Sequence, residues 1–169
     1  MEKMRKQDII DDAGNVKYEL LRKSTAYKAY QVATLCTTVD HKPIVKGKTT
    51  IDQVKIALNN YIGDGRDQMK NIDRFMEVSD LLKSPETKAL FECKYLVGQG
   101  LAFGVLGIRD GNLYWYSKSD NHTKYKWSSE QAFISFLVTE YNTYNSEENV
   151  QNFYEDLVKE VSNKGAWIE

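Results

Sequence analysis

The stretch LAFGVLGIRDGNLYWYSK, residues 101–118, carries the strongest local signal in the chain. It holds two alternating apolar runs joined by Asp110 and Gly111, a pair suited to a type I′ turn. If these two residues form the loop, apolar side chains meet across the hairpin in two pairs, Ile108 with Leu113 and Leu106 with Trp115. The stretch therefore predicts a β-hairpin with one apolar face.

The opposite face of this hairpin pairs Val105 with Tyr116 and Gly107 with Tyr114, so a tyrosine is expected to cover the glycine opposite it. A third alternating run, residues 123–127, follows after a polar stretch. Together the three runs predict a three-stranded antiparallel sheet.

Two helices are expected after the sheet. Ser128, with Gln131 three residues later, forms a capping box, and Ser146 precedes Glu147 and Glu148 in what looks like a second helix start. The second helix would carry its apolar side chains on one face: Val150, Phe153, Tyr154, Leu157 and Val161. These helices should close the core over the sheet.

The first half of the chain has helical spacing throughout. A charged stretch over residues 1–14 is expected to fray, and Asn15 then caps a helix that runs to about Leu35. Thr50 and Gln53 form another capping box, which predicts a helix up to Gly63. A further helix is expected from Met69 to Leu82, antiparallel to the one before it.

The stretch SPETKALFECKYLVGQG, residues 84–100, fits two structures. As a strand it would present Glu92 and Lys94 side by side, as many nucleases present a metal-binding carboxylate and a catalytic lysine. Ser84 and Pro85, however, are typical of the first positions of a helix. On a helix, residues two apart point about 200° apart, so these two side chains would diverge. The start signal favours the helix.

The fold class expected is α+β: about four N-terminal helices, a three-stranded antiparallel sheet that contains the 101–118 hairpin, and two C-terminal helices. The 169 residues, 41% of them hydrophobic, are enough for one core. We therefore expect one domain over residues 1–169.

The composition of the chain argues against several classes of protein. The chain shows no run long enough to cross a membrane and no signal peptide, so we expect a cytoplasmic protein with no membrane partner. Cys36 and Cys93 are too few for a disulfide framework and lack the spacing of a zinc site. We expect no metal and no cofactor. Residues 128–169 hold two lysines against eight acidic residues, which would repel nucleic acid.

The sequence gives little support for the known catalytic motifs. Gly47-Lys48-Thr49 resembles the end of a phosphate-binding loop, but Lys42 stands where the loop needs a glycine. His41 and His122 each lie in an expected loop near an aspartate, and neighbours in a loop rarely form a catalytic pair. The sequence therefore favours a protein that is not an enzyme.

A surface remains as the candidate site. The hairpin and the run after it interleave aromatic and basic residues, and the binding surface we expect consists of Tyr114, Tyr116, Lys118, Lys124, Tyr125 and Lys126. Such a surface suits a protein partner, because tyrosine dominates the energetics of interfaces. It also resembles a platform on which bases stack while lysines meet phosphates. Lysines on an edge strand can equally serve only to prevent aggregation.

Three hypotheses about function follow. The first is a non-catalytic binding module that acts through a protein partner, as an inhibitor, immunity or regulatory factor; the Lys-, Asn- and Tyr-rich composition is typical of AT-rich bacterial or phage genomes. The second is a nucleic-acid-binding accessory protein that uses the hairpin. The third is a metal-dependent nuclease built on Glu92 and Lys94. The lack of a catalytic constellation favours the first; the oligomeric state stays open.

Overall fold

The computed structural model of the chain describes residues 2–37, 47–63, 65–116, 122–146 and 152–169. The chain divides into two compact units, Met1–Ser84 and Pro85–Glu169. The single domain expected over residues 1–169 stays a prediction. Within the described residues there are seven α-helices and one three-stranded antiparallel sheet, which confirms the α+β class.

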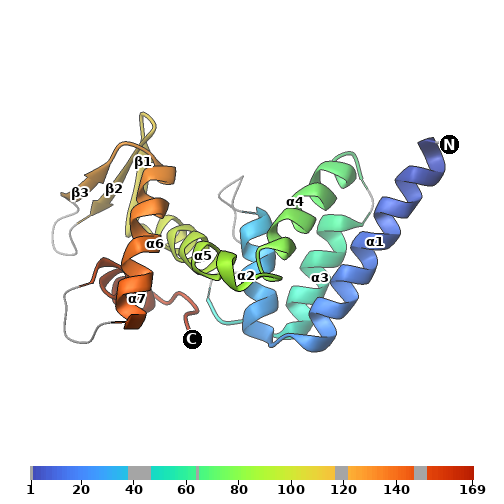
Figure 1. Cartoon of the computed structure of the whole chain (residues 1–169), viewed down its shortest axis with the longest axis horizontal. Coiled ribbons are helices and arrows are strands. Elements are labelled where there is room, and N and C mark those ends of the chain that lie inside the picture. Colours follow the sequence, from blue (N-terminus) through green and yellow to red (C-terminus); the bar gives the residue numbers. More distant parts are fainter. Residues whose placement is uncertain (1, 38–46, 64, 117–121, 147–151) are drawn as a thin grey trace. The chain divides into compact units, whose positions relative to one another are not determined.

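The first unit is built from helices alone in its described part. They are α1 (Glu2–Lys23), α2 (Ala26–Thr37), α3 (Ile51–Ile62) and α4 (Gln68–Asp80) (Figure 1). Helix α2 packs against both α3 and α4, and α1 contacts the other three. Apolar side chains from α2, α3 and α4 fill the space between them: Tyr30, Val32, Ala33, Val54, Leu58, Ile72 and Phe75.

The start of the first helix differs from the prediction. Asn15 does not cap a helix, because α1 begins at Glu2 and passes through Gly14 and Asn15 without a break. The expected helix to Leu35 is instead two helices. The first ends at Lys23, and Thr25 begins the second, because its hydroxyl accepts a hydrogen bond from the Lys28 N–H at 3.1 Å. Residues 2–14 are helical here, and their fraying in solution stays a prediction.

The next two helices follow the prediction. Thr50 caps α3, and its hydroxyl accepts from the Gln53 N–H at 3.3 Å. Helix α3 ends at Ile62, directly before Gly63, and α4 packs against it. The capping box therefore located α3 correctly, and the apolar spacing located α4, although α4 ends at Asp80 and not at Leu82.

The second unit opens with the helix that the sequence favoured over a strand. Pro85–Thr87 form a 3-10 turn, and α5 (Lys88–Ala102) continues from it. The helix passes through Gly98 and Gly100 and ends at Ala102. A Cβ at Gly100 would lie 2.6 Å from Leu106 Cδ1, so the glycine in this part of α5 allows a strand to approach closely rather than ending the helix.

The sheet has the predicted register. Strand β1 (Leu106–Arg109) pairs antiparallel with β2 (Asn112–Tyr116), which pairs antiparallel with β3 (Thr123–Trp127). Leu106 lies opposite Trp115 and Ile108 opposite Leu113, as expected. Both turn residues have positive φ, 53° at Asp110 and 79° at Gly111, as a type I′ turn requires. The first strand starts later than residue 101, because α5 extends to Ala102.

The C-terminal helices are α6 (Glu130–Ser146) and α7 (Phe153–Asn163), and both starts differ from the prediction. The cap of α6 is Ser129, one residue after Ser128, and its hydroxyl accepts from the Ala132 N–H at 2.9 Å. Ser146 ends α6 instead of starting α7, which is capped by Asn152. Glu147, Glu148 and Val150 lie outside the described residues.

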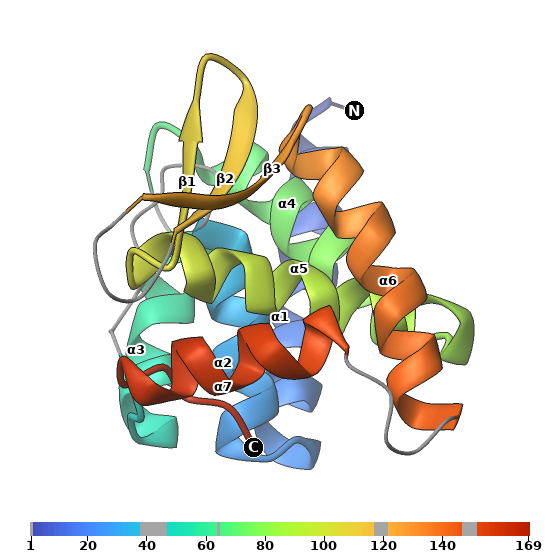
Figure 2. The ribbon, with the colours of Figure 1, turned by 90° about the vertical axis from the view of Figure 1, so that its left-hand side faces the viewer.

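The core of the second unit lies between the sheet and its three helices. Figure 2 shows the strands next to α5, with α6 and α7 beside that helix. Buried side chains from β1, β2 and the three helices, with Val105 just before β1, form one cluster: Cys93, Leu96, Val97, Val105, Leu106, Leu113, Trp115, Phe133, Leu137, Leu157 and Val161. The two C-terminal helices thus close the core over the sheet, as expected.

Candidate binding surface on the sheet

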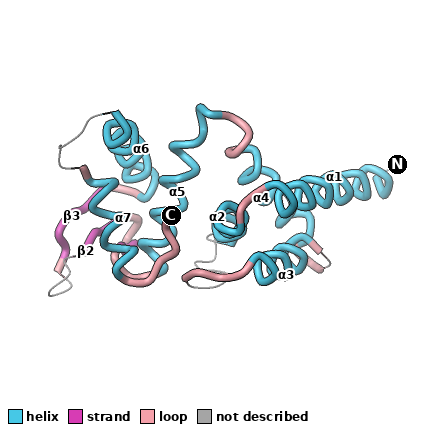
Figure 3. The backbone as a smooth tube through the Cα atoms, turned by 90° about the horizontal axis from the view of Figure 1, so that it is seen from below, coloured by secondary structure: helices cyan, strands magenta, loops and turns pink. Residues whose placement is uncertain are grey.

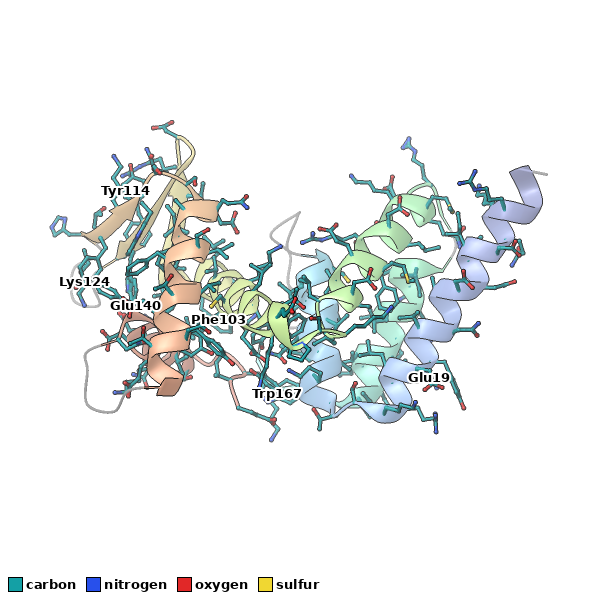
Figure 4. The ribbon with its side chains drawn as sticks, viewed as in Figure 1. Glu19, Phe103, Tyr114, Lys124, Glu140 and Trp167 are labelled. Carbon is teal, nitrogen blue, oxygen red and sulfur yellow. The ribbon has the colours of Figure 1, made fainter. Side chains whose placement is uncertain are left out.

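The sheet has two chemically different faces. Its inner face carries Leu106, Leu113 and Trp115, all buried against the helices. Its outer face carries Arg109, Tyr114, Tyr116 and Lys126, all partly or fully exposed. Figure 4 labels Tyr114 on the sheet. The outer face is the part of the sheet that a partner can reach.

Tyr114 is the centre of the outer face. The guanidinium carbon of Arg109 lies 4.6 Å from the centroid of its ring, and the Nζ atom of Lys126 lies 5.7 Å from the same centroid. Both distances are in the range of cation–π attraction. Because Lys126 is also the direct cross-strand partner of Tyr114, the register itself brings these groups together.

The second tyrosine of the outer face covers a glycine. A Cβ at Gly107 would lie 2.4 Å from the Tyr116 hydroxyl and 2.8 Å from Cε2 of its ring. The expected covering of this glycine is therefore present, but Tyr116, diagonal to it, makes the contact in place of Tyr114. The long side chain of Tyr116 reaches across the sheet because Gly107 leaves room for it.

Positive charge dominates the strands. The basic side chains of β1, β2 and β3 are Arg109, Lys124 and Lys126, all exposed, and these strands contain no acidic residue. Asp110, in the turn, is the nearest acidic group along the chain. A basic surface of this kind attracts an acidic partner.

Two of the predicted surface residues lie elsewhere. Tyr125 points to the inner face, where its ring centroid is 5.7 Å from that of Trp115 and 5.1 Å from that of Phe153. Lys124 is exposed on β3, with its Nζ atom 5.4 Å from the centroid of the Tyr125 ring (Figure 4). Lys118 lies outside the described residues. The structure thus brings together Tyr114, Tyr116 and Lys126 of the predicted set.

Arg109 belongs to this surface although the sequence prediction did not include it. Its position in the register identifies it: Arg109 pairs with Asn112, so it shares a face with Tyr114 two residues further along β2. The predicted pairing therefore already contained the signal for this residue.

The nuclease hypothesis loses its structural premise. Glu92 and Lys94 lie within α5, where side chains two residues apart diverge, and not on a strand. Within the described ranges, no three His, Cys, Asp or Glu side chains gather as metal ligands would. His122 is exposed next to β3, whereas His41, Asp40 and Asp120 lie outside those ranges.

The two cysteines are buried thiols. Burial raises the pKa of the Cys36 thiol to about 12, and it raises that of Cys93 to about 12 as well. A nucleophilic cysteine needs the opposite shift, since the thiolate is the reactive form. Neither thiol is therefore suited to catalysis.

Comparison with known proteins adds no family. No protein-family model, no curated protein and no solved structure matches the chain. In the part of the chain that the structure describes, no helix is both long and apolar enough to cross a membrane.

Proposed function

We propose that this chain is a non-catalytic binding module and that it recognises an acidic surface of a protein partner through the outer face of its sheet. The observation that carries the proposal is the arrangement of Arg109 and Lys126 around Tyr114. Two cations and a tyrosine on a rigid sheet resemble the composition of interface hot spots, in which Tyr and Arg are enriched. An inhibitory or regulatory role fits this proposal.

The geometry supports a protein partner over nucleic acid. Bases stack on open faces of aromatic rings. Here Arg109 and Lys126 lie over the ring of Tyr114, and Tyr116 lies over Gly107, so the protein itself already uses these ring faces. The cations and the tyrosine hydroxyls remain for a partner, and carboxylates match both.

A titration tests the proposal. The full chain is mixed at low salt with a fluorescein-labelled octaglutamate peptide, and separately with labelled single-stranded and duplex oligonucleotides. We expect the peptide to bind and Arg109→Glu/Lys126→Glu to weaken it at least about tenfold, since a like charge in an interface is strongly unfavourable. Lys88→Glu, an exposed reversal outside the strands, should leave the affinity unchanged.

Two results would overturn the proposal. Absence of peptide binding at millimolar concentration removes the acidic partner. Oligonucleotides that bind more tightly than the peptide, with a steep salt dependence, make the chain a nucleic-acid-binding protein instead.

A further inference from the structure

Strand β3 is an edge of the sheet. The strand order is β1-β2-β3, and β3 pairs with β2 alone among the described strands. Figure 3 shows β3 near β2. An edge strand presents unpaired N–H and C=O groups along its free side. Such an edge can accept a further strand from another protein, by main-chain hydrogen bonds that do not depend on sequence.

The inner side of this edge is an incompletely covered aromatic cluster. We call it the edge aromatic strip; it consists of Tyr125, Trp127, Phe136 and Phe153, each half-buried. The ring centroids are 5.4 Å apart for Trp127 and Phe136, and 5.3 Å apart for Phe136 and Phe153. They come from β3, α6 and α7 and form one apolar surface.

The strip includes side chains of β3, one strand further out than the central strand β2. Trp115 stands on the central strand, directly opposite Tyr125, and is fully buried. Tyr125 and Trp127 occupy the same inner face one strand further out and are only half-buried. The lower burial coincides with the place of β3 at an edge among the described strands, so a further strand on that side would add cover.

The outer side of the same edge is basic. Lys126 lies on the outer face opposite Tyr114, whereas Lys124 stands at a register shift between β2 and β3; both lysines are exposed. Lysines on an edge discourage pairing with an apolar strand. They favour a strand that carries carboxylates next to them, because opposite charges in cross-strand positions attract.

We infer that β3 accepts an extended segment of the partner as a fourth strand, one that alternates acidic and apolar residues. Its acidic side chains meet Lys126 on the outer side and the exposed Lys124 beside it, and its apolar side chains cover the edge aromatic strip on the inner side. This inference rests on the proposed function, of which it gives the mode of binding and the sequence pattern of the partner.

Peptides of defined pattern test the inference on the full chain. The probe is a labelled octapeptide of alternating glutamate and valine, and the matched control is an octapeptide of the same composition with the four glutamates before the four valines. We expect the alternating peptide to bind at least tenfold more tightly. Equal affinity for the two peptides would show that only charge is recognised and would overturn strand addition.

Backbone methylation tests the hydrogen bonds themselves. Along a strand successive N–H groups point to opposite sides, so only one set can face β3. Two isomers of the alternating peptide are made, one N-methylated at its glutamates and one at its valines. We expect one isomer to lose binding and the other to retain it within about threefold. Retention by both isomers, or loss by both, would contradict pairing along one edge.

The outcomes separate the two proposals. If octaglutamate binds and Arg109→Glu/Lys126→Glu weakens it, but the alternating peptide binds no more tightly than octaglutamate, strand addition fails while the acidic-partner proposal stands. If neither peptide binds, both fail. Lys124→Glu/Lys126→Glu should reverse the preference, so that the variant binds an alternating lysine and valine peptide more tightly than the glutamate one; an unchanged preference would also overturn the inference.

Discussion

The indole Nε1 of Trp115 donates a hydrogen bond to a carboxylate oxygen of Glu160 across 2.8 Å, and both side chains are buried. Trp115 comes from the central strand and Glu160 from α7, so this bond connects the sheet to the last helix. A hydrogen bond to a charged group contributes about 1.5–3 kcal/mol, and a buried carboxylate without a partner is costly. The bond therefore fixes α7 on the sheet in one orientation.

Removal of the indole should destabilise the second unit for two reasons. Trp115→Phe takes away the donor to Glu160 and leaves a space in the core, so we expect a loss of about 3 kcal/mol or more in the free energy of unfolding. Urea unfolding followed by circular dichroism measures it. The double variant Trp115→Phe/Glu160→Leu should recover part of the loss, because it buries no carboxylate.

Lys159→Ala is the control for this experiment. Lys159 stands next to Glu160 on α7, but it is exposed and forms a surface ion pair with Glu155 at 3.1 Å. Its removal should change stability by less than about 0.5 kcal/mol. A loss as large as that of Trp115→Phe would show that any change on α7 destabilises the unit, and would contradict a special role for the buried bond.

Two glycines in helices should respond in opposite directions to substitution by alanine. Gly14 in α1 has no atom within 4 Å of where a Cβ would stand, so Gly14→Ala should stabilise by about 0.5–1 kcal/mol through helix propensity. At Gly100 the added Cβ would meet Leu106 Cδ1 at 2.6 Å. We expect Gly100→Ala to destabilise by about 1–3 kcal/mol, because the strand must move.

Thermal unfolding of both variants checks this pair. Gly100→Ala/Leu106→Ala removes the clash at the cost of an apolar contact, and the two changes should be less harmful together than the sum of the single effects. Strict additivity would mean that Gly100 and Leu106 are not in contact.

The sequence predicted the sheet better than the helix ends, for a physical reason. A two-residue turn at Asp110 and Gly111 leaves only one register for β1 and β2, and each of their cross-strand pairs follows from it. The register shift between β2 and β3 does not follow from this turn. Helix ends depend on which of several competing caps is used. Ser146 and Asn152 both suit a helix start, and only the tertiary contact of Asn152 with Glu140 on α6 selects between them.

The arrangement of the candidate surface was predicted in part for the same reason. Alternation placed Tyr114, Tyr116 and Lys126 on one face, and the structure keeps them there. Tyr125 alternates with the lysines, so the pattern alone already placed it on the face of the strand opposite to Lys126. Whether that face is buried depends on the helices that cover it. Phe153 of α7 supplies the cover, and its helix start was the one that the sequence misplaced.

The cysteines should be unreactive in the folded protein. Burial raises the pKa of Cys36 and that of Cys93 from 9.0 to about 12, so both remain protonated at pH 8 and neither is accessible. We expect a thiol reagent to label neither within minutes at pH 8, and both at once in denaturant. Fast labelling of either residue in the native protein would contradict its burial.

The neutral thiols also imply in which direction the folding stability changes with pH. A group with a raised pKa in the folded state contributes stability below its ordinary pKa, and this contribution is lost as the pH rises. For these two thiols, the stability is lost over the pH range from about 9 toward 12. Compared with Cys36→Val/Cys93→Val, the wild type should therefore lose more stability between pH 8.5 and 10.5; identical slopes in denaturant unfolding would show that the thiols ionise alike in both states.

Asn152 connects α6 to α7 and offers the sharpest test of this connection. Its side-chain oxygen accepts from the Glu155 N–H at 3.1 Å, while Nδ2 donates to the Glu140 carbonyl oxygen at 2.7 Å and to Glu140 Oε2 at 3.0 Å. Asn152→Asp keeps the cap but places a second carboxylate against Glu140. We expect a loss of about 2–4 kcal/mol at pH 7, from repulsion and from the lost donor.

The deficit of Asn152→Asp should shrink as the pH falls from 7 to 4.5, because protonation of one carboxyl restores a donor between the two groups. Asn152→Ser is the matched control: it keeps a capping oxygen, adds no charge and should show a smaller deficit that does not change with pH. Urea unfolding at pH 4.5, 5.5 and 7.0 gives both series. A deficit of Asn152→Asp that stays constant over this range would mean that its carboxylate does not face Glu140, and that the contact between α6 and the start of α7 is not formed in solution.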